Sequence, residues 1–220
     1  MKKSVITFFL LLMSVVIFAQ DFANFSKYEQ DNLKIKSQNT KPEAVFMGDS
    51  ITEGWVSTDP KFFTDHNFIG RGISGQVTSQ MLIRFREDVI NLGPKKVIIL
   101  AGINDIAENQ GKISHEKILG NIISMVELAK ANKIKVVLCS VLPAYDFWWR
   151  AGLQPAEKVV AFNKLLKNYA KKNKIPYIEY FDEMKDERNG LPKLYADDEV
   201  HPNLNGYKKM EEILMEILKK

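Results

Sequence analysis

From residue 44 onward, short apolar and often β-branched runs alternate with longer segments in which apolar residues recur every three or four positions. Runs such as residues 97–100 show no polar alternation, which is typical of strands buried on both faces of a sheet. The alternation of strand and helix indicates a parallel sheet covered by helices on both sides. We therefore predict a three-layer α/β/α fold with about five parallel strands, at residues 44–47, 67–69, 96–101, 135–141 and 177–180.

The composition is that of a globular domain, with 45% hydrophobic and 26% charged residues among 220. The formal net charge of +4, to which Lys2 and Lys3 contribute, is too small to indicate a nucleic-acid partner. No repeat or linker divides residues 44–220, so we expect one domain there. Residues 20–43 are polar and weakly patterned, and we expect an N-terminal arm or short helix packed on that domain.

The first residues have the layout of a secretory signal peptide. Lys2 and Lys3 precede an apolar run at residues 5–18, and the small residue Ala19 stands before the polar Gln20. The run is shorter than the roughly 20 residues that a transmembrane helix requires, although a retained anchor is the alternative. We expect residues 1–19 to be removed and the mature protein to be extracytoplasmic, either periplasmic or secreted, without a stable membrane anchor.

Cys139 is the single cysteine, so no intramolecular disulfide can form. It lies within an apolar run, which favours a thiol buried in the core over a redox or nucleophilic role. An exported chain without disulfides depends on its hydrophobic core for stability.

Candidate catalytic residues follow the predicted strands at their carboxyl ends, where parallel α/β sheets bind ligands. Ser50 follows the first strand, Gly75 lies in a glycine-rich loop after the second, and Asn104 follows the third. All three suit an anionic intermediate, because a helix N-terminus, an open backbone N–H and a side-chain amide stabilise negative charge. The structural alternatives are a helix N-cap for Ser50, a simple turn for Gly75 and a loop-capping amide for Asn104.

His201 is one of three histidines, and Pro202 after it favours an extended loop over a helix. Asp198 lies three residues earlier, a spacing that lets a turn bring its carboxylate against the imidazole. A carboxylate in that position fixes the imidazole tautomer and stabilises the imidazolium that forms when histidine accepts a serine proton. A solvated acidic loop beside an unrelated histidine is the alternative.

Together, four segments resemble the conserved blocks of the SGNH (GDSL) hydrolases, serine esterases and lipases distinct from the α/β-hydrolases. The resemblance covers about residues 44–216 and is strongest to secreted bacterial acetylesterase-like members. It implies the SGNH hydrolase fold, a flavodoxin-like doubly wound sheet with its site at the carboxyl ends of the strands. The segments are, in order, Gly48-Asp49-Ser50-Ile51, Gly72-Ile73-Ser74-Gly75, Gly102-Ile103-Asn104-Asp105 and Asp198-Glu199-Val200-His201-Pro202.

The resemblance also implies a role for each site residue. Ser50 would be the nucleophile, His201 the general base and then acid, and Asp198 the group that orients His201. The backbone N–H groups of Ser50 and Gly75 and the side-chain amide of Asn104 would form the oxyanion hole. No metal or organic cofactor is implied, and the three histidines are too scattered in the sequence to suggest a metal site.

The fold does not determine which ester is cleaved. Trp148 and Trp149 follow the fourth predicted strand in an aromatic loop, where they could stack on sugar rings, wall an acyl pocket or pack on the core. We expect a short-chain, acetyl ester on a carbohydrate, so the substrate would be a small-molecule or glycan ester. The alternatives are a lysophospholipase and, from another class, a catalytically silent carbohydrate-binding module. The sequence leaves the oligomeric state open.

Overall fold

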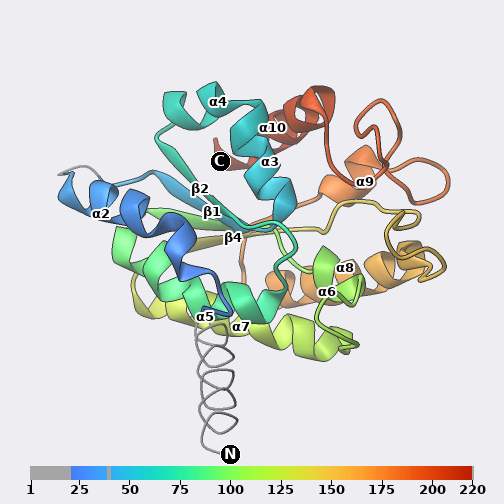
Figure 1. Cartoon of the computed structure of the whole chain (residues 1–220), viewed down its shortest axis with the longest axis horizontal. Helices are drawn as coiled ribbons and strands as arrows, with labels where there is room; N and C mark the ends of the chain where they lie inside the picture. Colours follow the sequence, from blue (N-terminus) through green and yellow to red (C-terminus); the bar gives the residue numbers. More distant parts are fainter. Residues whose placement is uncertain (1–20, 39–40, 220) are drawn as a thin grey trace, which may run out of the picture.

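The chain forms one sheet of five parallel strands in the order β2-β1-β3-β4-β5 (Figure 1). The structure is a computed structural model that describes residues 21–38 and 41–219, so the expected signal peptide lies outside the described residues. The strand order has the chain crossing from one side of β1 to the other, which is the flavodoxin-like doubly wound arrangement. The predicted three-layer α/β/α fold is confirmed. The strands are β1 (Ala44–Gly48), β2 (Phe68–Gly72), β3 (Lys96–Ile99), β4 (Lys135–Cys139) and β5 (Tyr177–Ile178).

Helices cover both faces of the sheet (Figure 1). The upper layer in this view holds α3 (Ser50–Thr58), α4 (Pro60–Asp65), α9 (Tyr180–Met184) and α10 (Leu204–Leu218). The lower layer holds α5 (Thr78–Asp88), α7 (His115–Ala131) and α8 (Pro155–Lys172), with the short α6 (Ile103–Ile106) beside α8. Ahead of β1, the arm forms η1 (Phe25–Tyr28) and α2 (Glu29–Ser37), which lie against α5 and against η2 (Ile90–Leu92).

Aromatic side chains fill the space between the sheet and the α3 and α4 helices. Phe46 of β1 packs edge-on against Trp55, with ring centroids 5.5 Å apart. Trp55 is stacked between Phe62 and Tyr207, each 5.7 Å away, and it is 1% exposed. Because Tyr207 lies on α10 and Trp55 on α3, this stack joins these two helices.

Several strands differ in length from their predicted limits. Asn67 was predicted to begin the second strand, but its φ of 53° is left-handed, so β2 begins at Phe68. β2 then continues through Gly72, because residues 68–72 pair in parallel register with the whole of β1. β5 ends at Ile178, since the chain turns into α9 at Tyr180. β3 and β4 also end two residues before their predicted limits, where the chain leaves the sheet for the site loops.

Cys139 is buried at the end of β4, as predicted for a core thiol. Burial raises the pKa of its thiol well above the ordinary value, which disfavours the reactive thiolate. In the described part of the chain, no helix combines the length and apolar character needed to cross a membrane.

Candidate functional site

Ser50 begins α3 directly after β1, with its hydroxyl free of any capping role. The N-cap is Asp49, whose Oδ1 accepts a hydrogen bond from the Ile51 backbone N–H at 3.0 Å. A helix takes one such side-chain cap from the residue before its first turn. The N-cap alternative for Ser50 therefore does not hold, and its hydroxyl is available for another partner.

That partner is His201, which the fold brings to Ser50 from 151 residues away. Ser50 Oγ lies 3.0 Å from His201 Nε2, and His201 Nδ1 lies 2.7 Å from Asp198 Oδ2. With the Nδ1 proton donated to the carboxylate, Nε2 is left to accept the serine proton. The three predicted side chains thus form a continuous hydrogen-bonded series ending at the Ser50 hydroxyl.

The Asp198 carboxylate is held by its own turn. Its Oδ1 accepts hydrogen bonds from the backbone N–H groups of Val200, at 2.9 Å, and His201, at 2.7 Å. Partial burial acts to raise the pKa of Asp198, but these bonds and the bond from the His201 ring leave it below its usual value. Asp198 therefore stays ionised, as a group that orients an imidazole and stabilises its charged form must.

Gly75 lies in the loop between β2 and α5, close to the start of α3. Its φ of +76° is left-handed, and a Cβ atom there would meet nothing within 4 Å, so the residue faces open space. Gly72 just before it allows the loop to approach α3, because a Cβ atom at Gly72 would lie 2.2 Å from the backbone nitrogen of Glu53. The loop is thus placed beside Ser50 with one residue open to a ligand.

Asn104 is oriented by two neighbours. Its Nδ2 donates to the backbone oxygen of Gln76 at 3.1 Å, and its Oδ1 accepts from Asn109 Nδ2 at 2.9 Å. Because Asn109 occupies the oxygen, the amide nitrogen is fixed on the side of the β2–α5 loop. An amide nitrogen carries two hydrogens, so one remains for a ligand. The simple loop-capping alternative accounts for only one of those two N–H groups.

Two buried carboxylates next to these residues were not identified from the sequence. Burial raises the pKa of Asp49 to about 7, with Asp105 raising it further and the Ile51 N–H and His201 opposing the shift. Burial also raises the pKa of Asp105 to about 6, although its oxygens accept from the backbone N–H and hydroxyl of Thr78 at 2.9 and 2.7 Å. Asp49 could have been found, since an aspartate before a predicted helix is a strong N-cap signal.

Arg84 of α5 was also missed, and its side chain is fully buried. Its guanidinium donates to Gln76 Oε1 at 2.6 Å, to Asp88 Oδ2 at 2.8 Å and to the backbone oxygens of Gly48 and Arg71 at 2.9 and 3.0 Å. It therefore connects the ends of β1 and β2 to the loop that contains Gly75. No spacing in the sequence predicts the role of Arg84, because its hydrogen-bond partners lie up to 36 positions away.

The aromatic loop after β4 places its two tryptophans differently. Trp148 is 72% exposed, which excludes the alternative that its side chain packs on the core. Trp149 is partly buried, stacks on Phe147 at 4.9 Å and lies 6.1 Å from the His201 ring between centroids. Arg150 fastens the loop by donating to the backbone oxygen of Ala107 at 2.9 Å. One tryptophan thus borders the imidazole and the other stands in solvent.

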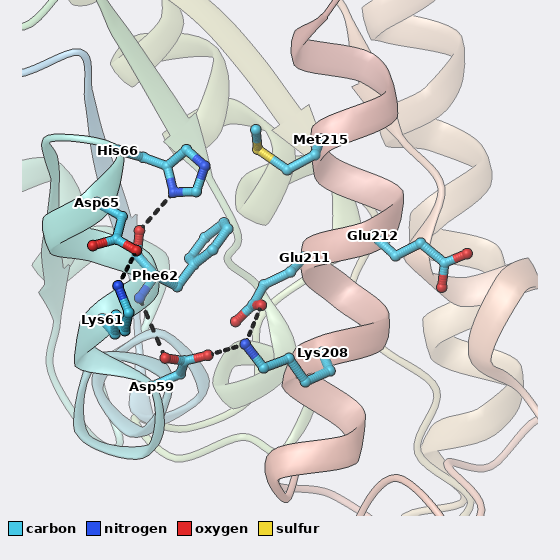
Figure 2. Close-up of a pocket in the computed structure, with 9 residues that line it drawn as sticks. All are labelled: Asp59, Lys61, Phe62, Asp65, His66, Lys208, Glu211, Glu212 and Met215. Carbon is cyan, nitrogen blue, oxygen red and sulfur yellow. Dashed lines mark hydrogen bonds and ion pairs between the residues drawn. The ribbon is translucent and has the colours of Figure 1, made fainter.

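A cavity of about 450 Å³ between α4 and α10 lies apart from these residues (Figure 2). Lys208 bridges Asp59 and Glu211 there. Glu211 also accepts from Trp55 Nε1 at 3.1 Å. His66 Nδ1 forms a hydrogen bond with the backbone oxygen of Phe62, at 2.8 Å. The contacts of Lys208 and Glu211 hold α10 to α3 and to the Asp59 cap of α4, while the His66 contact lies within α4 and its C-cap. Among the residues that the structure describes, no cluster of three or more His, Cys, Asp or Glu side chains is placed to hold a metal ion.

Comparison with known proteins identifies relatives of the same architecture. A GDSL-like lipase of Bacteroides thetaiotaomicron VPI-5482 is 47% identical, with a TM-score of 0.87 over 90% of this chain and 98% of that one. A proposed acylhydrolase of Bacteroides fragilis NCTC 9343 is 46% identical, with a TM-score of 0.86 over 91% and 98%. An uncharacterised lipoprotein of Bacillus subtilis (strain 168) is 30% identical over 83 residues, which span only 34% of its length and 36% of this chain.

The sequence model of the GDSL-like lipase/acylhydrolase family matches residues 46–209. The chain belongs to this family, and the predicted resemblance to the SGNH (GDSL) hydrolases is confirmed. Its class is accordingly that of the carboxylic ester hydrolases.

The buried Asp49 makes a prediction about stability. Between its ordinary pKa of 3.8 and its native pKa of about 7, the native state holds a proton that the unfolded chain has lost. Rising pH through this window therefore disfavours the native state. Asp49→Asn keeps an oxygen for the Ile51 N–H but cannot ionise. The free energy of unfolding of the variant, relative to that of wild type, should therefore increase as the pH rises from 3.8 to about 7, and this difference should be constant at higher pH.

Urea unfolding of both proteins across this pH range measures the difference. Asp65→Asn, which removes a carboxylate that is half exposed, is the matched control and should show little pH-dependent difference. A difference between Asp49→Asn and wild type that stays constant with pH would contradict the burial of an ionisable Asp49.

Proposed function

We propose that this chain hydrolyses short-chain esters through an acyl-serine intermediate, with Ser50 as nucleophile, His201 as general base and acid, and Asp198 as the group that orients His201. The observation that carries the proposal is the series Ser50 Oγ to His201 Nε2 at 3.0 Å and His201 Nδ1 to Asp198 Oδ2 at 2.7 Å. The first distance is within the reach that proton transfer from the nucleophile requires, and the second is that of a hydrogen bond that orients the base.

In the first step, His201 Nε2 takes the Ser50 proton as Oγ bonds to the ester carbonyl carbon. The carbonyl oxygen becomes an oxyanion, and the ionised Asp198 stabilises the imidazolium. His201 then returns the proton to the leaving alcohol oxygen as the ester C–O bond breaks, which gives the acyl-serine. Water, deprotonated by His201, repeats the sequence and releases the acid.

The oxyanion would be held by three donors: the backbone N–H groups of Ser50 and Gly75 and the side-chain amide of Asn104. Ser50 is the first residue of α3, where backbone N–H groups have no partner within the helix and the helix dipole favours negative charge. Asn109 supports the role of Asn104, because it holds the amide oxygen and so turns the nitrogen toward the loop. Donors fixed in this way need no rearrangement when charge develops.

Ser50→Ala should abolish hydrolysis of p-nitrophenyl acetate, leaving at most a residual rate about 10³- to 10⁴-fold over water, with the fold intact by circular dichroism. A phosphonate should label Ser50 in wild type, as peptide mass spectrometry would show. Ser57→Ala, on the far turn of the same helix, is the control and should keep wild-type kcat. A Ser50→Ala variant with a tenth or more of the wild-type rate would end the assignment of the nucleophile.

We further propose that the substrate is an acetyl ester on a carbohydrate. The side chains of His201 and Asp198 are 39% and 36% exposed, so the site is open at the surface. An open site suits a small acyl group, because a long chain gains its binding free energy only by burial. The exposed ring of Trp148 and the half-exposed ring of Tyr145 suit the apolar faces of sugars.

Trp148→Ala should raise KM for acetylated oligosaccharides while p-nitrophenyl acetate turnover stays within about twofold of wild type, because that ester reaches Ser50 without the loop. Ile83→Ala removes another exposed apolar side chain, on α5, and should change neither value. A loss that grows with acyl chain length, by about 0.8 kcal/mol or roughly fourfold per methylene, would instead favour the lysophospholipase alternative. Parallel assays on p-nitrophenyl esters of increasing length make the distinction.

We propose in addition that the mature enzyme is extracytoplasmic, on the basis of the basic and apolar layout of residues 1–19. Protein exported by its native host should begin at Gln20 or within a few residues of it. Intact-mass analysis measures this start, and a full-length chain in the membrane fraction would contradict removal of the segment.

A further inference from the structure

The N-terminal arm lies directly against the loop that contains Gly75. The backbone oxygen of Ala23 accepts from Gln76 Nε2 at 2.7 Å, and that of Phe22 accepts from Gln80 Nε2 at 2.8 Å. The hydroxyl of Tyr28 donates to the backbone oxygen of Gly72. The arm precedes residue 46, where the family match begins, yet it touches one of the proposed oxyanion donors through a single intervening residue.

That intervening residue, Gln76, is 3% exposed and has every polar group of its side chain engaged. Its Oε1 accepts from Arg84 Nε at 2.6 Å, while its Nε2 donates to Ala23. Its backbone oxygen accepts from Asn104 Nδ2 at 3.1 Å. Gln76 therefore joins three separate parts of the chain, namely the arm, α5 and α6.

Gly75 has no side chain with which to fix its own position. Its neighbours fix it instead: the Ser74 backbone N–H donates to Glu53 at 2.7 Å on one side, and Gln76 is held on the other. The Asn104 amide is held by the same Gln76 residue, through its backbone oxygen. Two of the three proposed oxyanion donors thus depend on where Gln76 lies.

On the basis of the ester hydrolysis proposed above, we propose that Gln76 is the positioning residue of the oxyanion hole, through which the N-terminal arm and Arg84 set the Gly75 and Asn104 donors. Gln76 touches no reacting atom in this scheme. It acts because a donor displaced by a fraction of an ångström stabilises the transition state less, while the substrate in its ground state is bound as before. Its loss should therefore lower kcat and leave KM nearly unchanged.

Gln76→Met tests this role, since methionine has a similar length but neither donates to Ala23 nor accepts from Arg84. Its kcat on p-nitrophenyl acetate should fall about 10- to 100-fold with KM within about twofold of wild type. The rate at which a phosphonate labels Ser50 should fall by the same factor as kcat/KM, because the oxygen of the tetrahedral adduct occupies the same hole. A merely structural role would not move these rates in a fully folded protein.

Gln80→Met is the matched control, because Gln80 also donates to an arm carbonyl and accepts from the Val77 backbone N–H at 3.1 Å, but makes no bond to Arg84 or Asn104 and is not adjacent to Gly75. Its kcat should stay within about twofold of wild type. Asn104→Ala provides the scale, as the loss of one donor typically costs about 10²- to 10³-fold in kcat. Should Gln76→Met not fold, Gln76→Glu retains an acceptor for Arg84, loses the bond to Ala23 and adds a negative charge. Gln80→Glu adds the same charge and is its control, and kcat should fall further in Gln76→Glu than in Gln80→Glu.

The outcomes separate this role from the proposed function. An active wild type whose Gln76 variant keeps at least half of the wild-type kcat, or whose Gln80 variant loses as much as the Gln76 variant, would overturn the role of Gln76 alone. A wild type without esterase activity would overturn the proposed hydrolysis, and the role of Gln76 with it.

Discussion

The structure around the candidate site depends on the hydrogen bonds of the buried Arg84 guanidinium. Withdrawing such a charge from water is costly unless its donors find acceptors, and here Asp88, Gln76 and two backbone oxygens accept from four of its five N–H groups. Those oxygens belong to Gly48 and Arg71, at the ends of β1 and β2. The charge can be buried only when both strands and the following loop are in place, so it couples the packing of α5 to the geometry beside Ser50.

The topology explains why the functional residues meet at all. Because β1 lies inside the sheet with β2 on one side and β3 on the other, three strands deliver their carboxyl ends to the same place. Ser50, Gly75 and Asn104 follow those strands in turn. The histidine comes from the loop before α10, which the stack of Tyr207 on Trp55 holds against α3.

Apolar periodicity was sufficient to predict the fold class, whereas the residues of the proposed site were predicted from the resemblance of four short motifs to the SGNH (GDSL) hydrolases. The sequence was not sufficient for Gln76 and Arg84, whose partners are set by how α5 packs on the sheet. Nor could it separate Trp148 from Trp149, since adjacent residues in a loop have no periodicity that indicates which is exposed. Asn67 likewise read as strand, and only its left-handed backbone places it outside β2.

The attachment of α10 to α3 has a dynamic consequence. The Tyr207 hydroxyl donates to the backbone oxygen of Ile51 at 2.9 Å, so the elements that carry Ser50 and lead to His201 belong to one helical layer. Arg84 and Gln76 belong to the opposite side of the sheet, while the arm contacts both sides, since it bonds to Gln76 and its Lys27 pairs with Glu53 of α3. Shear between the two layers would change the distance from Ser50 to the proposed Gly75 and Asn104 donors more than the distance from Ser50 to His201. The proton transfer and the oxyanion stabilisation proposed above therefore depend on different contacts in this fold.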